Sequence, residues 1–141
     1  PASSGVAWPS PRFVVGTGVG TTDQCVTDSL TGLMWVRSPS TTPDTWANAL
    51  TSANNLTLCG FSDWRLPNVR ELNSLVNSEV ASSAVYLISQ GFSNVQTGFY
   101  WSSSTFADNL SLAWIITMGN GEVGAFSKSN SSFVWPVRAG Q

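Results

Sequence analysis

The sequence predicts an α+β domain, and two observations carry that prediction. Two helix patterns lie between residues 42 and 76, and short apolar or aromatic segments separated by Gly, Asn and Ser follow Val80. Helices followed by several short strands are typical of α+β folds. A chain of 141 residues has the length of one domain. We therefore expect residues 12–141 to fold as a single domain and residues 1–11 to be a leader or linker.

Strands are expected at the start of this domain. Arg12–Val15 lies between prolines and glycines, which favours a short strand. Val26 then leads into a polar turn over residues 28–32, and the apolar run Leu33–Val36 follows. This pattern predicts a hairpin in which Gly32 supplies the unusual backbone angles of the turn.

The first helix is expected in the segment TTPDTWANALTSANNL. Thr42 is the expected cap, Pro43 suits the first helical position, and Asp44 favours the positive end of the helix dipole. Cys59-Gly60 is expected to end the helix, because glycine is the usual terminator. The apolar residues that recur at helical spacing on one face are Trp46, Ala49, Leu50, Ala53 and Leu56.

The second helix is expected to begin inside the segment SDWRLPNVREL, at residues 62–72. Asn68 followed by Glu71 fits a capping box, with Asn in place of the usual Ser or Thr. The buried stripe of this helix would consist of Val69, Leu72, Leu75 and Val76.

The remaining segments predict strands. Trp114–Met118, the turn at residues 119–121 and Glu122–Phe126 indicate a β-hairpin. Phe133–Arg138 indicates a last strand at an edge or end of a sheet, because Pro136 has no N–H to donate to a ladder.

Composition excludes several classes of function. Only 10% of the residues are charged, against about 25% in typical soluble domains, and the net charge is −2 without any basic run. These values argue against a nucleic-acid partner. No apolar stretch approaches the ~20 residues of a membrane span, so we expect no membrane insertion. A polar surface with few charges is common among extracellular and virion proteins, and it favours a Cys25–Cys59 disulfide over free thiols.

Catalytic chemistry finds little support in the sequence. The chain has no histidine, which excludes a Ser-His-Asp or Cys-His arrangement and disfavours a metal site built on the two cysteines. The acids form no cluster of the kind that calcium needs. We therefore expect no enzyme activity, no catalytic residue, no metal and no cofactor. Tryptophans could form a sugar platform, but core packing is the preferred interpretation for six of the seven.

The motifs DSLTGLMW, DWRLPNVREL and YWSSS occur in this order and resemble the Lcl C-terminal (DUF1566) family. The resemblance runs from about Arg12 to Gln141. It implies a C-type lectin-like fold, with two helices packed on short antiparallel strands and a loop-rich C-terminal half that carries the binding face. It also implies that Trp64 and Leu66 enter the core, and that Arg65 meets a carboxylate or backbone carbonyls rather than a substrate.

Some members of the family resemble the variable proteins of diversity-generating retroelements, which substitute at adenines and favour AAY codons at surface positions. Such codons cannot become Trp, Met, Lys, Glu or Gln. Constant residues would then be Trp101, Trp114, Met118, Glu122, Lys128 and Trp135. Candidates for a variable, ligand-binding face are Phe106, Asp108, Leu110, Leu112, Ile116, Gly124, Ala125, Phe126, Ser127, Ser129, Ser131 and Ser132. The other interpretation is that Ile116 and Phe126 alternate into a hairpin core and that residues 127–132 form a plain solvated loop.

These observations favour a non-enzymatic ligand-binding module that is extracellular, on a cell or virion surface. Its partner would be a protein or glycan on another cell or virion surface, contacted by a C-terminal face that a retroelement would diversify. The alternative is a bacterial or viral adhesin domain of fixed specificity for glycan or extracellular matrix. A third hypothesis is a purely structural or oligomerising domain.

Overall fold

The computed structural model describes residues 12–16, 24–77 and 79–139, so the expected leader at 1–11 lies outside the described part. The described residues form seven strands and three helices. In chain order they are β1 (Phe13–Val15), β2 (Cys25–Asp28), β3 (Leu33–Val36), α1 (Trp46–Asn54), α2 (Val69–Asn73), α3 (Ser83–Ser89), β4 (Phe99–Thr105), β5 (Leu112–Thr117), β6 (Val123–Ser127) and β7 (Val137–Ala139).

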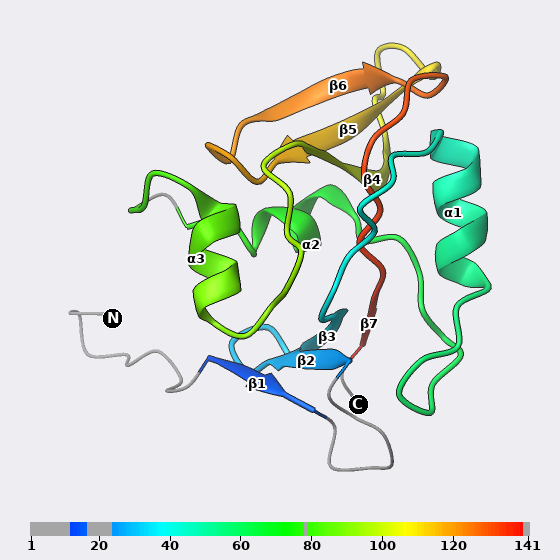
Figure 1. The fold of residues 1–141 in the computed structure, drawn as a ribbon. Coiled ribbons are helices and arrows are strands. Elements are labelled where there is room, and N and C mark those ends of the chain that lie inside the picture. The colour runs from blue at the N-terminus through cyan, green and yellow to red at the C-terminus, as the bar shows by residue number, and fades with distance from the viewer. Residues whose placement is uncertain (1–11, 17–23, 78, 140–141) are drawn as a thin grey trace.

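The strands form two antiparallel sheets at opposite ends of the molecule (Figure 1). The first sheet has the order β1-β2-β3-β7, and the second has the order β4-β5-β6. Helices α2 and α3 lie between the two sheets on one side, while α1 stands along the other side (Figure 1).

The expected α+β class is wrong, and so is the C-type lectin-like arrangement of two helices on short strands. The structure is mostly β, with sheets of four and three strands and helices of only nine, five and seven residues. The apolar spacing at residues 56, 75 and 76 suggested longer helices. These side chains instead pack against or into the main core from a turn or from irregular segments, so their burial does not require continued helix.

The helix boundaries show which local signals were reliable. The capping box of α2 is confirmed, since Asn68 Oδ1 accepts from Glu71 N at 2.8 Å and Glu71 Oε1 accepts from Asn68 N at 2.9 Å. At α1 the cap position belongs to Thr45 rather than Thr42, and it has no side-chain cap bond. Helix α3, capped by Ser82, was not predicted.

Cys59-Gly60 does not end α1, which stops at Asn54. Both residues have positive φ, 55° and 82°, and they form a tight turn closed by Leu58 and Phe61. Leu58 N donates to Phe61 O at 2.9 Å, and Phe61 N donates to Leu58 O at 3.0 Å. The glycine therefore serves a hairpin turn and not a helix end, and the expectation that Cys59-Gly60 terminates the helix is wrong.

The first hairpin, β2–β3, is confirmed, and a buried ion pair fastens its turn. Asp28 Oδ1 accepts from Leu30 N at 3.0 Å, and Gly32 has a φ of 77°. Arg12 Nε and Nη2 donate to the two Asp28 carboxylate oxygens at 2.8 Å each. The same Nη2 donates to Ser74 O at 2.8 Å, which links this turn to the segment after α2.

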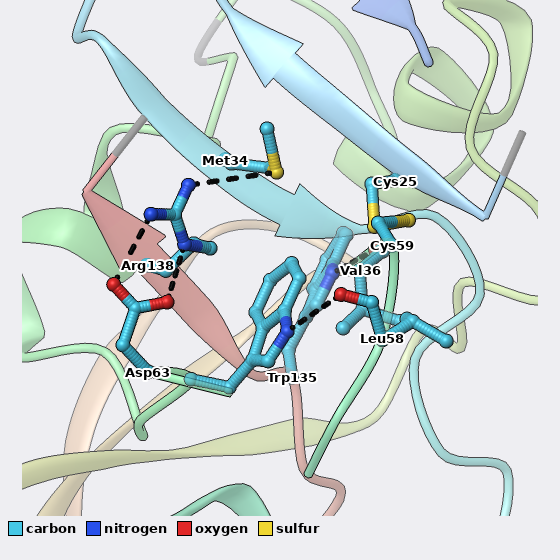
Figure 2. The surroundings of a disulfide bond; sticks show 9 residues. Cys25, Met34, Val36, Leu58, Cys59, Asp63, Trp135 and Arg138 are labelled. Carbon is cyan, nitrogen blue, oxygen red and sulfur yellow. Dashed lines mark hydrogen bonds and ion pairs between the residues drawn. A yellow bond between two sulfur atoms is a disulfide. The ribbon is translucent and has the colours of Figure 1, made fainter. Parts of the chain in front are cut away.

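Cys25 and Cys59 are joined by a disulfide beside the first sheet, the pairing that the sequence favoured (Figure 2). Arg138 on β7 points its guanidinium at Asp63, with Nε–Oδ1 and Nη2–Oδ2 distances of 2.5 and 3.1 Å (Figure 2). The disulfide and this ion pair both attach the segment after α1 to the first sheet.

The last strand is shorter than expected, because β7 covers only residues 137–139. It does lie at the end of its sheet, as the proline suggested. The segment before it connects the two sheets. Phe133 exchanges hydrogen bonds with β4, donating to Phe99 O at 2.9 Å and accepting from Trp101 N at 3.0 Å, and Pro136 O accepts from Val36 N at 3.2 Å.

Two hydrophobic clusters form the core. The larger one packs the first sheet, α2 and α3 against Tyr100, Ile116 and Met118. The smaller one joins α1 to the second sheet through Ala49, Ala53, Trp101 and Ile115, among others. Four tryptophans are buried as expected, namely Trp35, Trp64, Trp101 and Trp135, and Leu66 is buried with them. Trp46 and Trp114 remain partly exposed.

No described helix has both the length and the apolar character needed to cross a bilayer.

Candidate functional site

Two loops that are separate in sequence lie together at one end of the second sheet. Leu112 at the start of β5 pairs with Ser127 at the end of β6, and Lys128 N donates to Ser111 O at 2.9 Å. The β4–β5 loop therefore lies beside the turn that follows β6. We call residues 106–112 and 127–131 together the loop surface.

The β4–β5 loop has a defined conformation. Phe106 N donates to Leu112 O at 2.9 Å, and Leu112 N donates to Asn109 O at 3.0 Å. The ring of Phe106 packs edge-on against Trp114, with centroids 5.0 Å apart. At the tip, Leu110 is 71% exposed, the highest value among the exposed large apolar side chains of the described chain, and Asp108 is also exposed. An apolar side chain presented this way on a fixed loop is suited to contact another molecule.

The turn after β6 contributes hydroxyl groups to the loop surface. Ser127 Oγ and Ser129 Oγ lie 2.9 Å apart, and Asn130 N donates to Ser127 O at 2.9 Å. Ser129 and Ser131 are exposed. The surface thus combines hydroxyl groups with a few apolar anchors, a mixture that also characterises antibody contact faces.

Lys128 joins the parts of this end of the sheet. Its Nζ donates to Leu110 O at 2.8 Å and to Thr105 Oγ1 at 3.0 Å. It also lies 4.0 Å from the centroid of the Trp46 ring, at the start of α1. Sequence reasoning treated Lys128 only as a constant position. Its structural role, holding the loop tip to α1, could not be read from a lone lysine in a serine-rich stretch.

Two of the predicted contact residues are buried away from this surface. Ile116 is fully buried against the main core and pairs with Tyr100, as the alternative interpretation of a hairpin core held. Ser132 is also buried, and its backbone exchanges hydrogen bonds with Asp44 at 2.9 Å in both directions. Neither side chain can meet a ligand in this conformation.

The four predicted residues within β6 divide between the two sides of the sheet. Successive side chains of a strand point to opposite faces. Gly124 and Phe126 therefore share one face, while Ala125 lies on the other face with Ser127. Phe126 is half-buried, with its ring 5.5 Å from that of Phe99 and 6.2 Å from that of Trp101.

A groove of about 570 Å³ runs along β6 on the Gly124 and Phe126 side. Its floor includes Ile115, and it is open because Gly124 has no side chain: a Cβ placed there would meet only Ile115 Cγ1, at 4.0 Å. Phe99, which is 44% exposed, lies along the groove together with Phe126, while Asn120 and Glu122 lie toward one end.

A second hollow, also of about 570 Å³, lies beside α1 and was not anticipated from the sequence. Hydroxyl groups such as those of Ser38, Ser40 and Ser52 line it together with Arg37, over apolar side chains that include Leu56. These residues come from distant parts of the chain and have no shared motif. No sequence signal could have brought them together.

The ion pairs of the described residues belong to the frame of the fold. Arg65 donates two hydrogen bonds to Glu71, at 2.6 and 2.7 Å, so the expectation that it meets a carboxylate is confirmed. Burial by itself would raise the pKa of Glu71, but the bonds from Arg65 and from Asn68 N outweigh burial and hold that pKa below its ordinary value. The hydrogen bonds from Arg138 likewise lower the pKa of Asp63.

The loop surface offers contact chemistry in the form of apolar anchors, hydroxyls and one carboxylate. Among the residues that the structure describes, no three Cys, Asp or Glu side chains gather as metal ligands would.

Comparison with curated proteins found no match. Residues 24–138, which are most of the chain, match the family described as the Lcl C-terminal domain. A match of this extent shows the relationship, and the chain belongs to the Lcl C-terminal domain family.

Proposed function

We propose that this domain is a non-enzymatic ligand-binding module of a cell or virion surface, and that it meets a protein or glycan ligand through the loop surface. One observation carries the proposal: Phe106, Asp108, Leu110, Ser129 and Ser131 come from two separate loops and lie at one end of the second sheet. A rigid sheet that positions loops for contact is a common architecture of binding proteins.

We further propose that these positions are diversified. Two neighbours would stay constant: Lys128, whose Nζ donates to Leu110 O at the loop tip, and Trp114, whose ring lies beside Phe106. A diversifying system that changed the exposed residues and left these two constant would alter the contact face without unfolding it.

Deep sequencing of the codons for residues 99–141 in the native population tests the diversification. We expect substitutions at Phe106, Asp108, Leu110, Ser129 and Ser131. Trp114, Met118, Glu122 and Lys128 should stay constant. If the codons of this segment do not vary in the population, the proposed diversification is wrong. Frequent substitution at the buried Ile116 or Ser132 would also contradict it.

An adhesin of fixed specificity is the second candidate, and the hollow beside α1 favours it. Serine hydroxyls and the Arg37 side chain beside an apolar floor are groups that can bind a sugar. Because these groups are not among the positions expected to vary, a site there would keep one specificity.

Glycan and extracellular-matrix arrays separate the two candidates. We would compare the unmodified chain with Leu110→Ser, which alters the loop surface, and with Ser52→Phe, which fills the hollow. Val85→Ser, on the exposed side of α3, is the matched control. Loss of the array signal only in Leu110→Ser supports the loop surface, whereas loss only in Ser52→Phe assigns binding to the hollow.

A further inference from the structure

β6 is the last strand of the second sheet, and its outer edge has no partner strand among the described residues. Thr117 N donates to Glu122 O and Lys128 N donates to Ser111 O, so these pairs face each other across the ladder. Bonded and non-bonded pairs alternate in an antiparallel ladder. Gly124 and Phe126 therefore direct their peptide groups toward β5, while Val123 and Ala125 direct theirs outward.

The sequence of β6 lacks the usual protection of an edge strand. Proteins commonly block free edges with lysine, proline or an inward-pointing charge. Val123–Ser127 reads VGAFS and contains none of these. A five-residue, mostly apolar strand whose outward peptide groups have no partner strand among the described residues can pair with another strand along this edge.

We propose that β6 pairs with β6 of a second copy of this chain, antiparallel and about a two-fold axis at Ala125. This register lets all five residues of each strand pair, and it joins the residues whose peptide groups point outward: Val123 with Ser127 of the other copy, and Ala125 with itself. An antiparallel pairing of this kind would extend the three-stranded sheet into a continuous sheet across both copies.

The same register is complementary in shape. It places Gly124 opposite Phe126 of the second copy, in a non-bonded pair, where side chains approach each other most closely. The groove is open above Gly124, because the nearest atom to a Cβ there would be Ile115 Cγ1 at 4.0 Å. The Phe126 ring leans toward β4, with its centroid 5.5 Å from that of Phe99, so the Cβ end of its side chain is the part that meets Gly124 of the second copy. By symmetry the contact forms twice.

Charge selects the antiparallel direction. β6 is flanked by Glu122 on one side and Lys128 on the other. Antiparallel pairing about Ala125 brings each Glu122 to the end of the strand where Lys128 of the other copy lies, whereas parallel pairing in register would align like charges. Lys128 keeps its bonds to Leu110 and Thr105, so its contribution is the position of its positive charge.

Sedimentation velocity of the 141-residue chain over a concentration series tests the pairing. We expect a reversible monomer–dimer equilibrium. Gly124→Val places a branched side chain against the Cβ of the second Phe126, and Ala125→Pro removes the outward N–H at the axis without breaking the ladder to β5. Each should weaken the dimer at least roughly tenfold. Val85→Ser, on α3, should leave it unchanged.

A cross-linking measurement keeps the proposal testable if a variant fails to fold. Both native cysteines are in the disulfide, so Ala125→Cys introduces the only free thiol of the chain. A short bis-maleimide should link Ala125→Cys into a dimer and should not link Val85→Cys. The proposal is overturned by a chain that stays monomeric at its highest soluble concentration, by a dimer insensitive to the two β6 variants, or by assembly beyond a dimer.

Discussion

Ser132 shows why exposure cannot be read from residue type. It belongs to a serine-rich stretch, yet it is buried and its Oγ has no hydrogen-bond partner among the described residues. A buried hydroxyl without a partner destabilises the folded state. We expect Ser132→Ala to raise the free energy of unfolding by about 1 kcal/mol, measured by urea denaturation. Ser131→Ala, at an exposed position, should change little, and a clear loss of stability in Ser132→Ala would contradict this account.

Lys128 is the residue whose removal should most affect the loop surface. Lys128→Met deletes two hydrogen bonds and the contact with the Trp46 ring. We expect it to lower the free energy of unfolding by about 2 kcal/mol, because hydrogen bonds from a charged donor and a cation–π contact are lost together. Hydrogen exchange at residues 106–111 should accelerate beyond the global change. Arg70→Met, an exposed charge on α2, is the control, and equal effects of both variants would refute a specific role for Lys128.

At the scale of elements, the start of α2 makes stability depend on pH. The pKa of Glu71 is lowered in the folded state from an ordinary value of 4.5. A carboxyl group of this kind contributes stability that is complete above its unfolded pKa and is lost as pH falls through its folded pKa. We expect the difference in unfolding free energy between the unmodified chain and Glu71→Gln to be greatest near neutral pH. It should shrink as the solution is acidified below about 4.5.

Urea denaturation at a series of pH values measures this difference. Glu79→Gln provides the matched control, since Glu79 is exposed and belongs to no ion pair among the described residues. If the Glu71→Gln difference stayed constant with pH, the ion pair with Arg65 would not be the source of the effect.

The elements also show how far local pattern extends. The β2–β3 hairpin and the capping box of α2 were predictable, because a turn or a cap depends on residues within a few positions of one another. The helix lengths were not, since Leu75 is buried from a turn as completely as Leu72 is from a helix. Burial of two positions limits where their side chains point, but it does not determine whether the backbone between them is helical.

For the whole molecule, the disulfide is the main covalent constraint. Cys25 and Cys59 are 34 positions apart and join β2 to the turn that follows α1. Closing a loop of this length stabilises a fold by roughly 4 kcal/mol in the chain-entropy model. Reduction should therefore lower the free energy of unfolding by about that amount, as measured by urea denaturation with and without dithiothreitol. The double variant Cys25→Ala/Cys59→Ala should match the reduced chain and be insensitive to the reductant.

The sequence by itself determined the family, the β2–β3 turn, the capping box of α2 and most of the buried aromatic residues. Each of these depends on neighbours in the chain or on apolar character, and Trp35, Trp64 and Arg65 behave as their motifs indicated. It did not determine the mostly β architecture. The apolar spacing suggested helices longer than α1 and α2 are, and most of the regular structure lies in the two sheets.

Only the tertiary structure decided which of the expected contact residues reach solvent. A shift of one residue along a strand turns a side chain to the other face. The pairing of β4, β5 and β6, with an irregularity between Trp101 and Thr105, therefore directs Ile116 into the core and leaves Leu110 exposed beyond the sheet. The register of a strand depends on the segments with which it pairs. It cannot be read from the composition of that strand alone.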